Sequence, residues 1–273
     1  MQGRKILLEA RIDHCFLDVD VLLMHVLEID RNALLTSLDR ATSEDDVHKF
    51  MRLIDARSSN APIQYLTGKC EFMSLEFVVN ENVLIPRPDT EVLVETVLVQ
   101  EAVGSVNGLE IGIGSGCISI SLEYYANNIK MIGVDISSCA VQVATQNYKR
   151  IISDESIFFV SNLFDNVPHG TLFDFIVSNP PYIETVEIER LGDNVKDYEP
   201  RSALDGGSDG LQFYRDICAA AGDYLTPQGR IYFEIGYNQA KAVEQILSDN
   251  GFVDINVVKD LAGKDRVIMA RRT

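Results

Sequence analysis

Apolar residues change their spacing along the chain, and the first segment has the spacing of helices. Over residues 1–68, positions such as Val19, Leu22 and Val26 recur every three to four residues, which predicts short helices that each bury one face. We expect Asp18 and Ser43 to cap two of these helices, because a side-chain oxygen at a helix start accepts a hydrogen bond from a free main-chain N–H. The helix after Ser43 is expected to bury the face formed by Val47, Phe50, Met51 and Ile54.

The spacing becomes that of β-strands near residue 70. Two strands that turn at residues 80–82 (Asn-Glu-Asn) are predicted by the apolar residues Phe72, Leu75, Phe77, Val79, Val83, Leu84 and Ile85. Pro86 and Pro88 end this hairpin, because proline lacks the N–H that a β-ladder needs. A hairpin over residues 69–86 therefore links the helical segment to the rest of the chain.

Strand-like and helix-like segments alternate from residue 107 onward. The predicted strands are residues 109–111, 131–134, 157–160, 173–177, 230–235, 253–258 and 267–270, and the predicted helices are residues 118–126, 140–150, 211–224 and 240–249. This alternation is typical of a mostly parallel sheet covered by helices on both faces. The loop before the last strand is short, so the last two strands should form a hairpin and one edge strand should run antiparallel.

These patterns predict an α/β fold with three parts. Residues 87–273 form a seven-stranded, mostly parallel, Rossmann-like sheet with one antiparallel edge strand. A small all-helical domain (1–68) and the β-hairpin linker (69–86) precede it.

The composition is that of a globular protein, with 46% hydrophobic and 24% charged residues in 273. No apolar run is long enough to span a membrane, and the N-terminus lacks the apolar core of a signal peptide. We therefore expect a cytoplasmic protein with no membrane partner. The five cysteines form no Cys-x-x-Cys pair and the four histidines show no metal-ligand spacing, which favours reduced thiols and no metal site.

The formal net charge is −17. Binding to a nucleic-acid duplex requires a basic stripe that replaces condensed counterions. The sequence has no such stripe, so a direct nucleic-acid partner is not expected.

A glycine-rich loop after the first strand of the sheet is a candidate cofactor site, formed by Glu110, Gly112, Ile113, Gly114, Ser115 and Gly116. Glycines in such a loop permit positive φ and let the backbone approach a ligand closely. The dinucleotide fingerprint needs a glycine where this chain has Cys117, so NAD or FAD matches the loop poorly.

Acceptor groups follow the next two strands. Asp135 ends the second strand, where a carboxylate can accept both ribose hydroxyls of a nucleoside. Together with the glycine loop, it predicts a nucleoside cofactor. Asn162 and Leu163 follow the third strand, where an amide and an apolar side chain can contact an adenine, although this segment taken alone is better explained by a simple strand-ending turn.

The most specific motif follows the fourth strand and consists of Asn179, Pro180, Pro181 and Tyr182. An amide nitrogen is a poor nucleophile, because its lone pair is delocalised into the carbonyl. The side-chain carbonyl of Asn179 and the main-chain carbonyl of Pro180 can each accept one N–H, which positions the nitrogen and stabilises its developing positive charge. The prolines keep these carbonyls rigid, and the Tyr182 ring offers a flat face. The motif therefore predicts methyl transfer to a planar amide or amine nitrogen.

Asn-Pro-Pro-Tyr after a glycine loop resembles the amino-methyltransferases, which include adenine-N6 DNA enzymes and protein-glutamine enzymes. The rest of the chain is similar to the peptide chain release factor glutamine methyltransferases (the HemK family). That similarity lies in residues 62–68 (Pro-Ile-Gln-Tyr-Leu-Thr-Gly), 85–91 (Ile-Pro-Arg-Pro-Asp-Thr-Glu), 199–200 (Glu-Pro), 206–207 (Gly-Gly), 209–211 (Asp-Gly-Leu), 234–236 (Glu-Ile-Gly) and 260–263 (Asp-Leu-Ala-Gly).

The resemblance implies transfer of a methyl group from S-adenosyl-L-methionine to N5 of the glutamine in the Gly-Gly-Gln motif of release factors, with S-adenosyl-L-homocysteine as product. It implies release factors as protein partners and a role in translation termination. We also expect the helical domain (1–68) to recognise the substrate, because selecting one glutamine of a protein requires contacts away from the reacting nitrogen. The implied cofactor residues are the glycine loop, Asp135, Leu163 and Asn179, and the implied substrate residues are those of the Asn-Pro-Pro-Tyr motif. Glu110 and Asn162 stand where the family usually has Asp, and Asp89 where it usually has Glu.

Other functions remain as alternatives. A related enzyme methylates a glutamine of a ribosomal protein, but its linker does not continue Ile-Pro-Arg as residues 88–91 (Pro-Asp-Thr-Glu) do here. For an adenine-N6 nucleic-acid methyltransferase, residues 183–209 are unfavourable, since they hold eight acidic and three basic residues. A binding module without activity would not need the intact Asn-Pro-Pro-Tyr motif.

Overall fold

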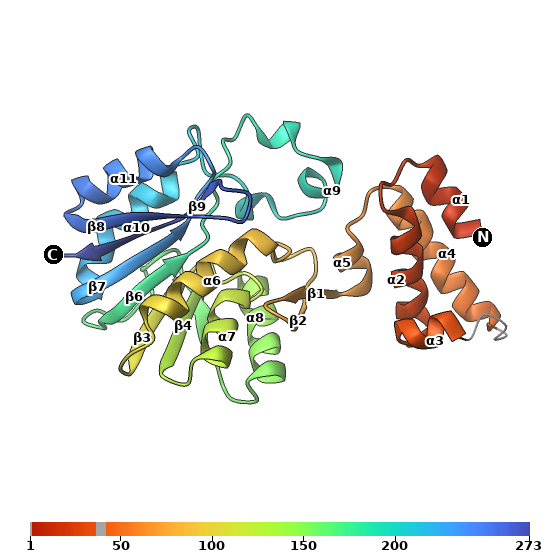
Figure 1. The fold of residues 1–273 in the computed structure, drawn as a ribbon, viewed down its shortest axis with the longest axis horizontal. Coiled ribbons are helices and arrows are strands. Elements are labelled where there is room, and N and C mark those ends of the chain that lie inside the picture. The colour runs from red at the N-terminus through yellow and green to blue at the C-terminus, as the bar shows by residue number, and fades with distance from the viewer. Residues whose placement is uncertain (1, 37–41) are drawn as a thin grey trace. The chain divides into compact units, whose positions relative to one another are not determined.

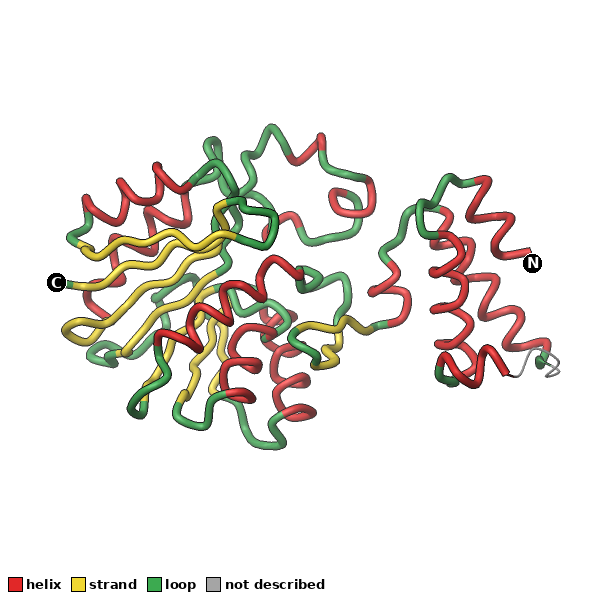
Figure 2. The backbone as a smooth tube through the Cα atoms, viewed as in Figure 1, coloured by secondary structure: helices red, strands yellow, loops and turns green. Residues whose placement is uncertain are grey.

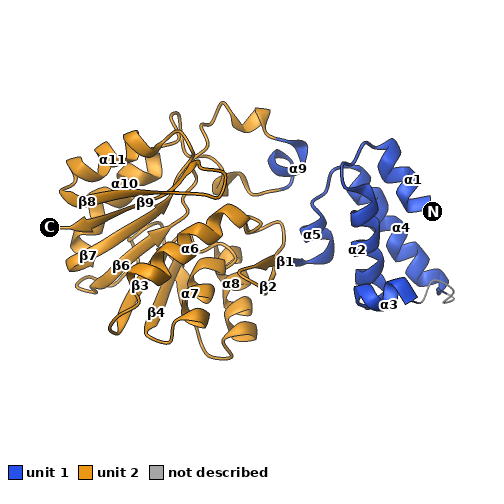
Figure 3. Ribbon diagram, viewed as in Figure 1, with its two compact units in different colours: residues 1–69, 192–198 blue, residues 70–191, 199–273 orange. Residues whose placement is uncertain are grey.

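The computed structural model describes residues 2–36 and 42–273. The chain forms two compact units, which Figure 3 distinguishes by colour. The first unit, called here the helical unit, comprises residues 1–69 and 192–198, and the second, the sheet unit, comprises residues 70–191 and 199–273. Within the described residues, no helix is long and apolar enough to cross a membrane.

The helical unit contains α1 (Gln2–Glu9), α2 (Cys15–Leu27), α3 (Arg31–Thr36), α4 (Glu44–Ser58), α5 (Ile63–Thr67) and α9 (Asp193–Lys196). Its core is formed by Leu7, Ile12, Cys15, Val19, Leu22 and Ile54. The segment 192–198 belongs to this unit although it is distant in sequence, and the hydroxyl of Tyr198 donates a 2.7 Å hydrogen bond to the carbonyl of Ser59. No local pattern in the sequence predicted that association.

Asp18 does not cap a helix, so that prediction was wrong. Helix α2 begins at Cys15, and Asp18 lies in its first turn. There Asp18 is 6% exposed, and its Oδ2 accepts a 2.7 Å hydrogen bond from Nε of Arg57. The buried hydrogen bond with Arg57 therefore explains why an acid occurs in this apolar stretch.

Ser43 caps α4 as predicted. Its Oγ accepts a 3.1 Å hydrogen bond from the main-chain N–H of Asp46. The predicted apolar face of α4 is buried unevenly, because Ile54 is fully buried whereas Val47 is 47% exposed. Phe50 and Met51 are half-buried between these extremes.

The linker hairpin turns earlier than predicted. Strand β1 (Lys69–Phe72) pairs with β2 (Leu75–Val78), which places the turn at Met73 and Ser74 and not at residues 80–82. Both turn residues have positive φ, 49° and 56°, as the favoured two-residue turn of a twisted hairpin requires. Such turns are usually formed by glycine, asparagine or aspartate, so no local pattern predicted a turn at these two residues.

Residues 83–85 do not form the predicted second strand. They follow a turn in which the main-chain N–H of Val83 donates to the carbonyl of Asn80 at 3.1 Å. Val83 and Ile85 are 1% and 2% exposed, so their apolar character comes from burial outside a β-ladder.

The sheet unit is built on seven strands, drawn in yellow in Figure 2: β3 (Val106–Ile111), β4 (Ile129–Asp135), β5 (Ile157–Val160), β6 (Phe173–Ser178), β7 (Leu225–Glu234), β8 (Phe252–Lys259) and β9 (Asp265–Arg272). Their order is β5-β4-β3-β6-β7-β9-β8. The first five are mutually parallel, and β9 pairs antiparallel with both β7 and β8. The predicted fold class is confirmed, and the antiparallel strand lies next to the edge strand β8.

Helices cover both faces of this sheet (Figure 1). One face is covered by α6 (Pro88–Gln100), α7 (Cys117–Tyr125) and α8 (Ser138–Ile151), and the other by α10 (Gln212–Tyr224) and α11 (Ala240–Asp249). Short 3₁₀ turns, η1 (Ile188–Arg190) and η2 (Arg201–Ala203), lie in the long connection after β6.

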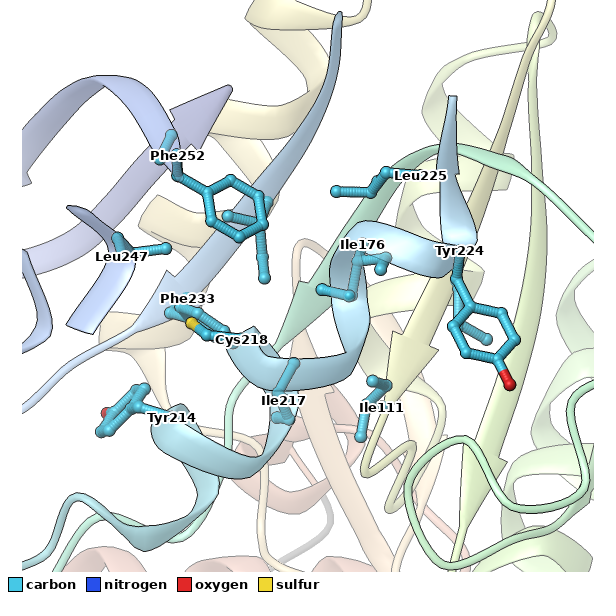
Figure 4. Close-up of a cluster of buried hydrophobic side chains, with 14 of the residues drawn as sticks. Ile111, Ile176, Tyr214, Ile217, Cys218, Tyr224, Leu225, Phe233, Leu247 and Phe252 are labelled. Carbon is cyan, nitrogen blue, oxygen red and sulfur yellow. The ribbon is translucent and has the colours of Figure 1, made fainter. Parts of the chain in front are cut away.

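Alternate residues of each strand enter different cores, because successive side chains of a strand point to opposite faces. Ile176 and Phe233 pack with α10 and α11, as Figure 4 shows beside Ile217 and Leu247. Phe175, the neighbour of Ile176, packs instead with α6, α7 and α8. The two cores hold the central strands rigidly, and the loops at their carboxyl ends rest on this frame.

Candidate active site

A cavity of about 310 Å³ lies at the carboxyl ends of β3, β4, β5 and β6. The chain proceeds from β3 to β4 and β5 on one side and then returns to β6 on the other side of β3. Ligands of open α/β sheets bind at this kind of switch in strand order. The predicted site residues that line the cavity are Glu110, Gly112, Ile113, Gly114, Ser115, Asp135, Asn162, Leu163, Asn179, Pro180 and Pro181.

The first two glycines of the loop present bare backbone to open space. Gly112 and Gly114 have φ of +78° and +53°, and a Cβ added to either would meet nothing within 4 Å. The loop is anchored from behind, because the N–H groups of Gly112 and Ile113 both donate to the carbonyl of Val134 at 2.9 Å. A ligand can therefore approach the main chain closely at these two positions.

Gly116 has a different role and lies outside the cavity lining. Its φ is +81°, and a Cβ there would lie 2.8 Å from Cδ1 of Ile120 and 3.2 Å from Cβ of Ala144. The third glycine thus permits the loop to turn into α7 and allows close packing of α7 against α8.

Asp135 is held by main-chain donors at the end of β4. The N–H of Gly114 donates to Oδ2 and the N–H of Ser137 donates to Oδ1, both at 2.9 Å. Burial raises the pKa of Asp135, and these main-chain hydrogen bonds oppose the rise. The carboxylate is fixed in direction and still borders the cavity with part of its acceptor capacity free.

Glu110 borders the cavity but is mainly tied to the start of α7. It is 1% exposed, and its Oε2 accepts hydrogen bonds from the main-chain N–H of Ser119, at 2.9 Å, and from the Ser119 hydroxyl. Burial raises the pKa of Glu110 to about 8, against these hydrogen bonds. Its structural role explains an acid here without any ligand.

Asn162 and Leu163 form one wall of the cavity. Leu163 has a positive φ of 47°, so the chain turns sharply after β5. The Asn162 side-chain amide donates to Asp165 at 3.3 Å, an exposed contact that a ligand can replace.

The Asn-Pro-Pro-Tyr motif divides into residues that border the cavity and one that supports them. Asn179, Pro180 and Pro181 line the cavity, and Nδ2 of Asn179 donates to Oγ1 of Thr90 at 3.2 Å. The preceding Ser178 donates from Oγ to the carbonyl of Ile111 at 2.7 Å, which locks the end of β6 to β3. The two prolines carry no N–H, so they offer acceptors alone.

Tyr182 does not line the cavity, in contrast to the other three residues of the motif. Its ring packs against the core beside α10, and its hydroxyl donates to Oε1 of Glu234 at 3.3 Å. Its carbonyl accepts a 3.0 Å hydrogen bond from Nε2 of Gln239. These two hydrogen bonds hold Tyr182, and with it the end of the Asn-Pro-Pro-Tyr motif, in place.

Comparison with known proteins identifies the family. A family model described as the PrmC N-terminal domain matches residues 1–68, and one described as the methyltransferase small domain matches residues 87–193. The release factor glutamine methyltransferase of Clostridium botulinum is 43% identical over 277 residues, which cover 100% of this chain and 97% of the relative. The chain belongs to the release factor glutamine methyltransferase family.

Further similarities agree with this family. The release factor glutamine methyltransferase of Fusobacterium nucleatum is 42% identical over 94% of this chain and 73% of the relative. Among solved structures, a methyltransferase from Pyrococcus furiosus has a TM-score of 0.57 and 18% identity, covering 84% of this chain and 99% of that one. At that identity the likeness shows the fold alone. The family predicted from the sequence motifs is confirmed.

Several cavity residues of this family member were not singled out as site residues from the sequence. Thr90, near the start of α6, and Phe213 and Ile217 of α10 line the cavity, as do residues of η2. Thr90 and Pro200 lie within motifs shared with the family, which was the available signal. Phe213 and Ile217 have the spacing of ordinary core residues, so nothing in the sequence indicated that they line a cavity.

Among the described residues, no group of three or more His, Cys, Asp or Glu is placed to hold a metal ion.

Proposed function

We propose that this protein transfers a methyl group from S-adenosylmethionine to the side-chain amide nitrogen N5 of the glutamine in the Gly-Gly-Gln motif of peptide chain release factors. This reaction supports translation termination in the cytoplasm. The observation that carries the proposal is the meeting of Asn179 and Pro180 with the glycine loop and Asp135 around one cavity. The names of the relatives supply the substrate.

The residues of the cavity are suited to S-adenosylmethionine. Asp135 offers fixed carboxylate oxygens for ribose hydroxyls. Gly112 and Gly114 leave room for the methionine portion beside the main chain. The hydroxyl of Ser115 is buried and has no hydrogen-bond partner among the described residues other than the Cys117 thiol, so it is available to a polar ligand group. When bound, S-adenosylmethionine supplies an electrophilic methyl group.

Asn179 and Pro180 act on the acceptor nitrogen. Oδ1 of Asn179 and the carbonyl oxygen of Pro180 each accept one N–H of the glutamine amide, which orients the nitrogen and stabilises its developing positive charge. No strong general base is required, because an amide that gains an alkyl group on nitrogen becomes acidic and loses its proton to water. Positioning and electrostatics therefore provide the catalysis.

The helical unit is proposed to recognise the release factor. A release factor contains many glutamines, so selection of one requires contacts away from the reacting nitrogen, and such remote binding energy also positions it. The helical unit exposes large apolar side chains, namely Leu8, Phe16, Leu17 and Leu35. Exposed apolar side chains that gather in one patch are typical of surfaces that bind another protein.

Mass spectrometry of a release factor incubated with the enzyme and S-adenosylmethionine tests the proposal. We expect one added methyl group, located on the glutamine of Gly-Gly-Gln, and none on a factor in which that glutamine is replaced by asparagine. Parallel incubations contain ribosomal proteins or adenine-containing DNA. Methylation of either of these in place of the release factor would overturn the proposal.

A further inference from the structure

The side-chain amide of Gln239 holds the carboxyl end of the Asn-Pro-Pro-Tyr motif. Its Nε2 donates two hydrogen bonds, to the carbonyl of Tyr182 at 3.0 Å and to the carbonyl of Gly210 at 3.2 Å. Its Oε1 accepts a 2.9 Å hydrogen bond from the main-chain N–H of Gly236. The amide therefore joins the start and the end of the long connection after β6 to the loop that follows β7.

The partners of this amide determine its orientation. An amide nitrogen carries two N–H donors, whereas an amide oxygen and a carbonyl oxygen only accept. A flipped Gln239 would direct Oε1 at two carbonyl oxygens and Nε2 at the N–H of Gly236, so all three hydrogen bonds would be lost. Only one orientation satisfies every partner, and it directs both N–H groups at the connection after β6.

The main chains are in close contact at the same place. A Cβ at Gly210 would lie 2.4 Å from the carbonyl oxygen of Tyr182. A Cβ at Gly206 would lie 2.7 Å from the carbonyl oxygen of Pro181 and 2.8 Å from Cα of Tyr182. Both glycines are buried, and the N–H of Gly206 donates to the carbonyl of Ile183 at 2.8 Å. The Gly-Gly and Asp-Gly-Leu motifs of the sequence therefore permit direct main-chain packing against the Asn-Pro-Pro-Tyr motif.

The amino end of the motif is fixed by the sheet. Oγ of Ser178 donates to the carbonyl of Ile111 at 2.7 Å, and Ser178 pairs with Phe233 of β7 in the parallel ladder. Between the two fixed ends lie Pro180 and Pro181, whose rings lock φ at about −65°. A short segment with few free torsions and both ends held has little freedom to move. The direction of the Pro180 carbonyl is therefore set by the supports at the two ends.

Gln239 is itself rigidly placed. It directly precedes α11, where its carbonyl accepts from the N–H of Val243 at 3.0 Å and its N–H donates to the carbonyl of Gly236 at 2.9 Å. Val243 and Leu247 of this helix are fully buried. Gln239 does not line the cavity, so its effect on a bound ligand passes through the residues that it holds.

We propose that Gln239 is a positioning residue, which holds the carboxyl end of the Asn-Pro-Pro-Tyr motif and so directs the Pro180 carbonyl at the substrate nitrogen. This inference rests on the proposed function, since it requires Pro180 to accept an N–H of the glutamine amide. Methyl transfer is sensitive to such support, because a displacement of about 1 Å in a positioned group can lower a rate about 100-fold.

Gln239→Met tests the inference, because methionine has nearly the length of glutamine and lacks the amide. We expect kcat for the intact release factor to fall by about tenfold or more, as misplacement of an acceptor predicts. KM for the release factor and the affinity for S-adenosylmethionine should change little, because the remote contacts and the glycine loop are untouched. The loss of kcat should be equally large on a short Gly-Gly-Gln peptide, which presents the same reacting amide.

Gln245→Met is the matched control on α11. Gln245 is exposed, and its Nε2 donates only to the side chain of Asp249, at 2.8 Å. This variant should keep the wild-type kcat on both substrates. Titration with S-adenosylmethionine gives the concentration of competent enzyme in each preparation, so kcat is expressed per folded molecule.

Gln239→Glu tests the two donated hydrogen bonds specifically. Glutamate keeps the shape of glutamine and its Oε1, but an ionised carboxylate has no N–H and would direct a second acceptor at two carbonyls. We expect a loss of kcat at least as large as that of Gln239→Met. Gln239 is half-buried, so both variants should fold, and thermal unfolding checks this. A wild-type kcat in either folded variant, or a loss confined to KM, would overturn the inference.

The same measurements reveal whether the proposed function or only this inference fails. A wild-type enzyme that does not methylate the release factor, or an Asn179→Ala variant with normal rate, contradicts the proposed function. A wild-type enzyme that is active and an Asn179→Ala variant that is slow, combined with a normal kcat for both Gln239 variants, contradict the positioning role alone.

Discussion

The main-chain N–H of Gly114 donates a 2.9 Å hydrogen bond to Oδ2 of Asp135, which joins the glycine loop directly to the end of β4. The other carboxylate oxygen accepts from the N–H of Ser137 at the same distance. Asp135 therefore orients the loop and, in the proposed function, binds the ribose of the cofactor. The two roles require the same fixed carboxylate.

Asp135→Ala is expected to weaken binding of S-adenosylmethionine by about 1.5–3 kcal/mol, the scale of hydrogen bonds to a charged group. The fold should persist, because the side chain lies at a strand end and supports little of the core. Calorimetric titration measures the affinity. Asp223→Ala, at an exposed position of α10, is the control and should bind normally. An unchanged affinity for Asp135→Ala would assign the ribose contact to another residue.

Asn179→Ala is expected to lower the single-turnover rate by about 10²–10³, as does removal of one preorganised group that stabilises developing charge. Cofactor affinity should change much less, because Asn179 acts chiefly on the substrate nitrogen. Rapid-quench measurement with saturating cofactor gives the rate. Asn256→Ala, at an exposed position of the edge strand β8, is the control. A rate close to wild type would show that Asn179 is not an essential acceptor.

Glu110 should make the stability of the protein depend on pH. Its pKa is raised by burial from 4.5 to about 8, so between these values the folded form holds a proton that the unfolded form has lost. The free energy of unfolding should therefore fall as pH rises through this range, by at most about 1.4 kcal/mol per pH unit.

Urea denaturation at several pH values, with Glu110→Gln as the comparison, checks this dependence. Glutamine cannot titrate, so the variant should lose less stability between about pH 5 and pH 8. The measurement uses the protein without cofactor, to avoid a second source of pH dependence. Parallel curves for the two proteins would contradict the assignment to Glu110.

Gly133→Ala is expected to destabilise the protein by about 1–3 kcal/mol through overpacking. A Cβ at Gly133 would lie 2.0 Å from Cδ1 of Ile113 and 2.9 Å from Cδ1 of Phe158. Because Ile113 lines the cavity, its displacement should also reduce cofactor affinity.

Gly222→Ala is the matched control for Gly133→Ala. A Cβ at Gly222 meets nothing within 4 Å, and the residue lies within α10, where alanine is favoured over glycine by about 0.5–1 kcal/mol. Thermal unfolding should show a small stabilisation of this variant and a clear destabilisation of the other. If Gly133→Ala and Gly222→Ala changed the stability equally, the residues around β4 would have to shift enough to accommodate the added methyl group without cost.

Replacement of Phe16 and Leu17 by serine is expected to reduce kcat/KM for the intact release factor about fivefold or more, since buried aromatic anchors dominate protein interfaces. The two residues are 58% and 51% exposed. A short Gly-Gly-Gln peptide should be used equally well by both enzymes, because it lacks remote contacts. Lys5→Ser, at an exposed position of α1, is the control. Equal losses on protein and peptide would exclude this surface from recognition.

Local pattern alone predicted most of the sheet unit. The alternation of strands and helices predicted a strand overlapping each of the seven strands of the sheet, although β7 begins at Leu225 and not at residue 230 as predicted. Local spacing suffices for this because it depends on which face of each element is buried. The hairpin turn failed this method, since Met73 and Ser74 adopt positive φ without a glycine or asparagine. Asp18 failed for the related reason that an acid inside a helix and an acid that caps one look alike in sequence.

The sequence by itself determined the order of the strands along the chain, the glycine loop, Asp135 and the Asn-Pro-Pro-Tyr motif, because parallel strands end at a common edge and bring these segments to it. Only the tertiary structure decided that Thr90 contacts Asn179, that Tyr182 turns away to Glu234, and that residues 192–198 join the helical unit. The physical reason is separation along the chain. Spacing reports which face of an element is buried, whereas partners many residues apart are selected by the packing of whole elements against one another.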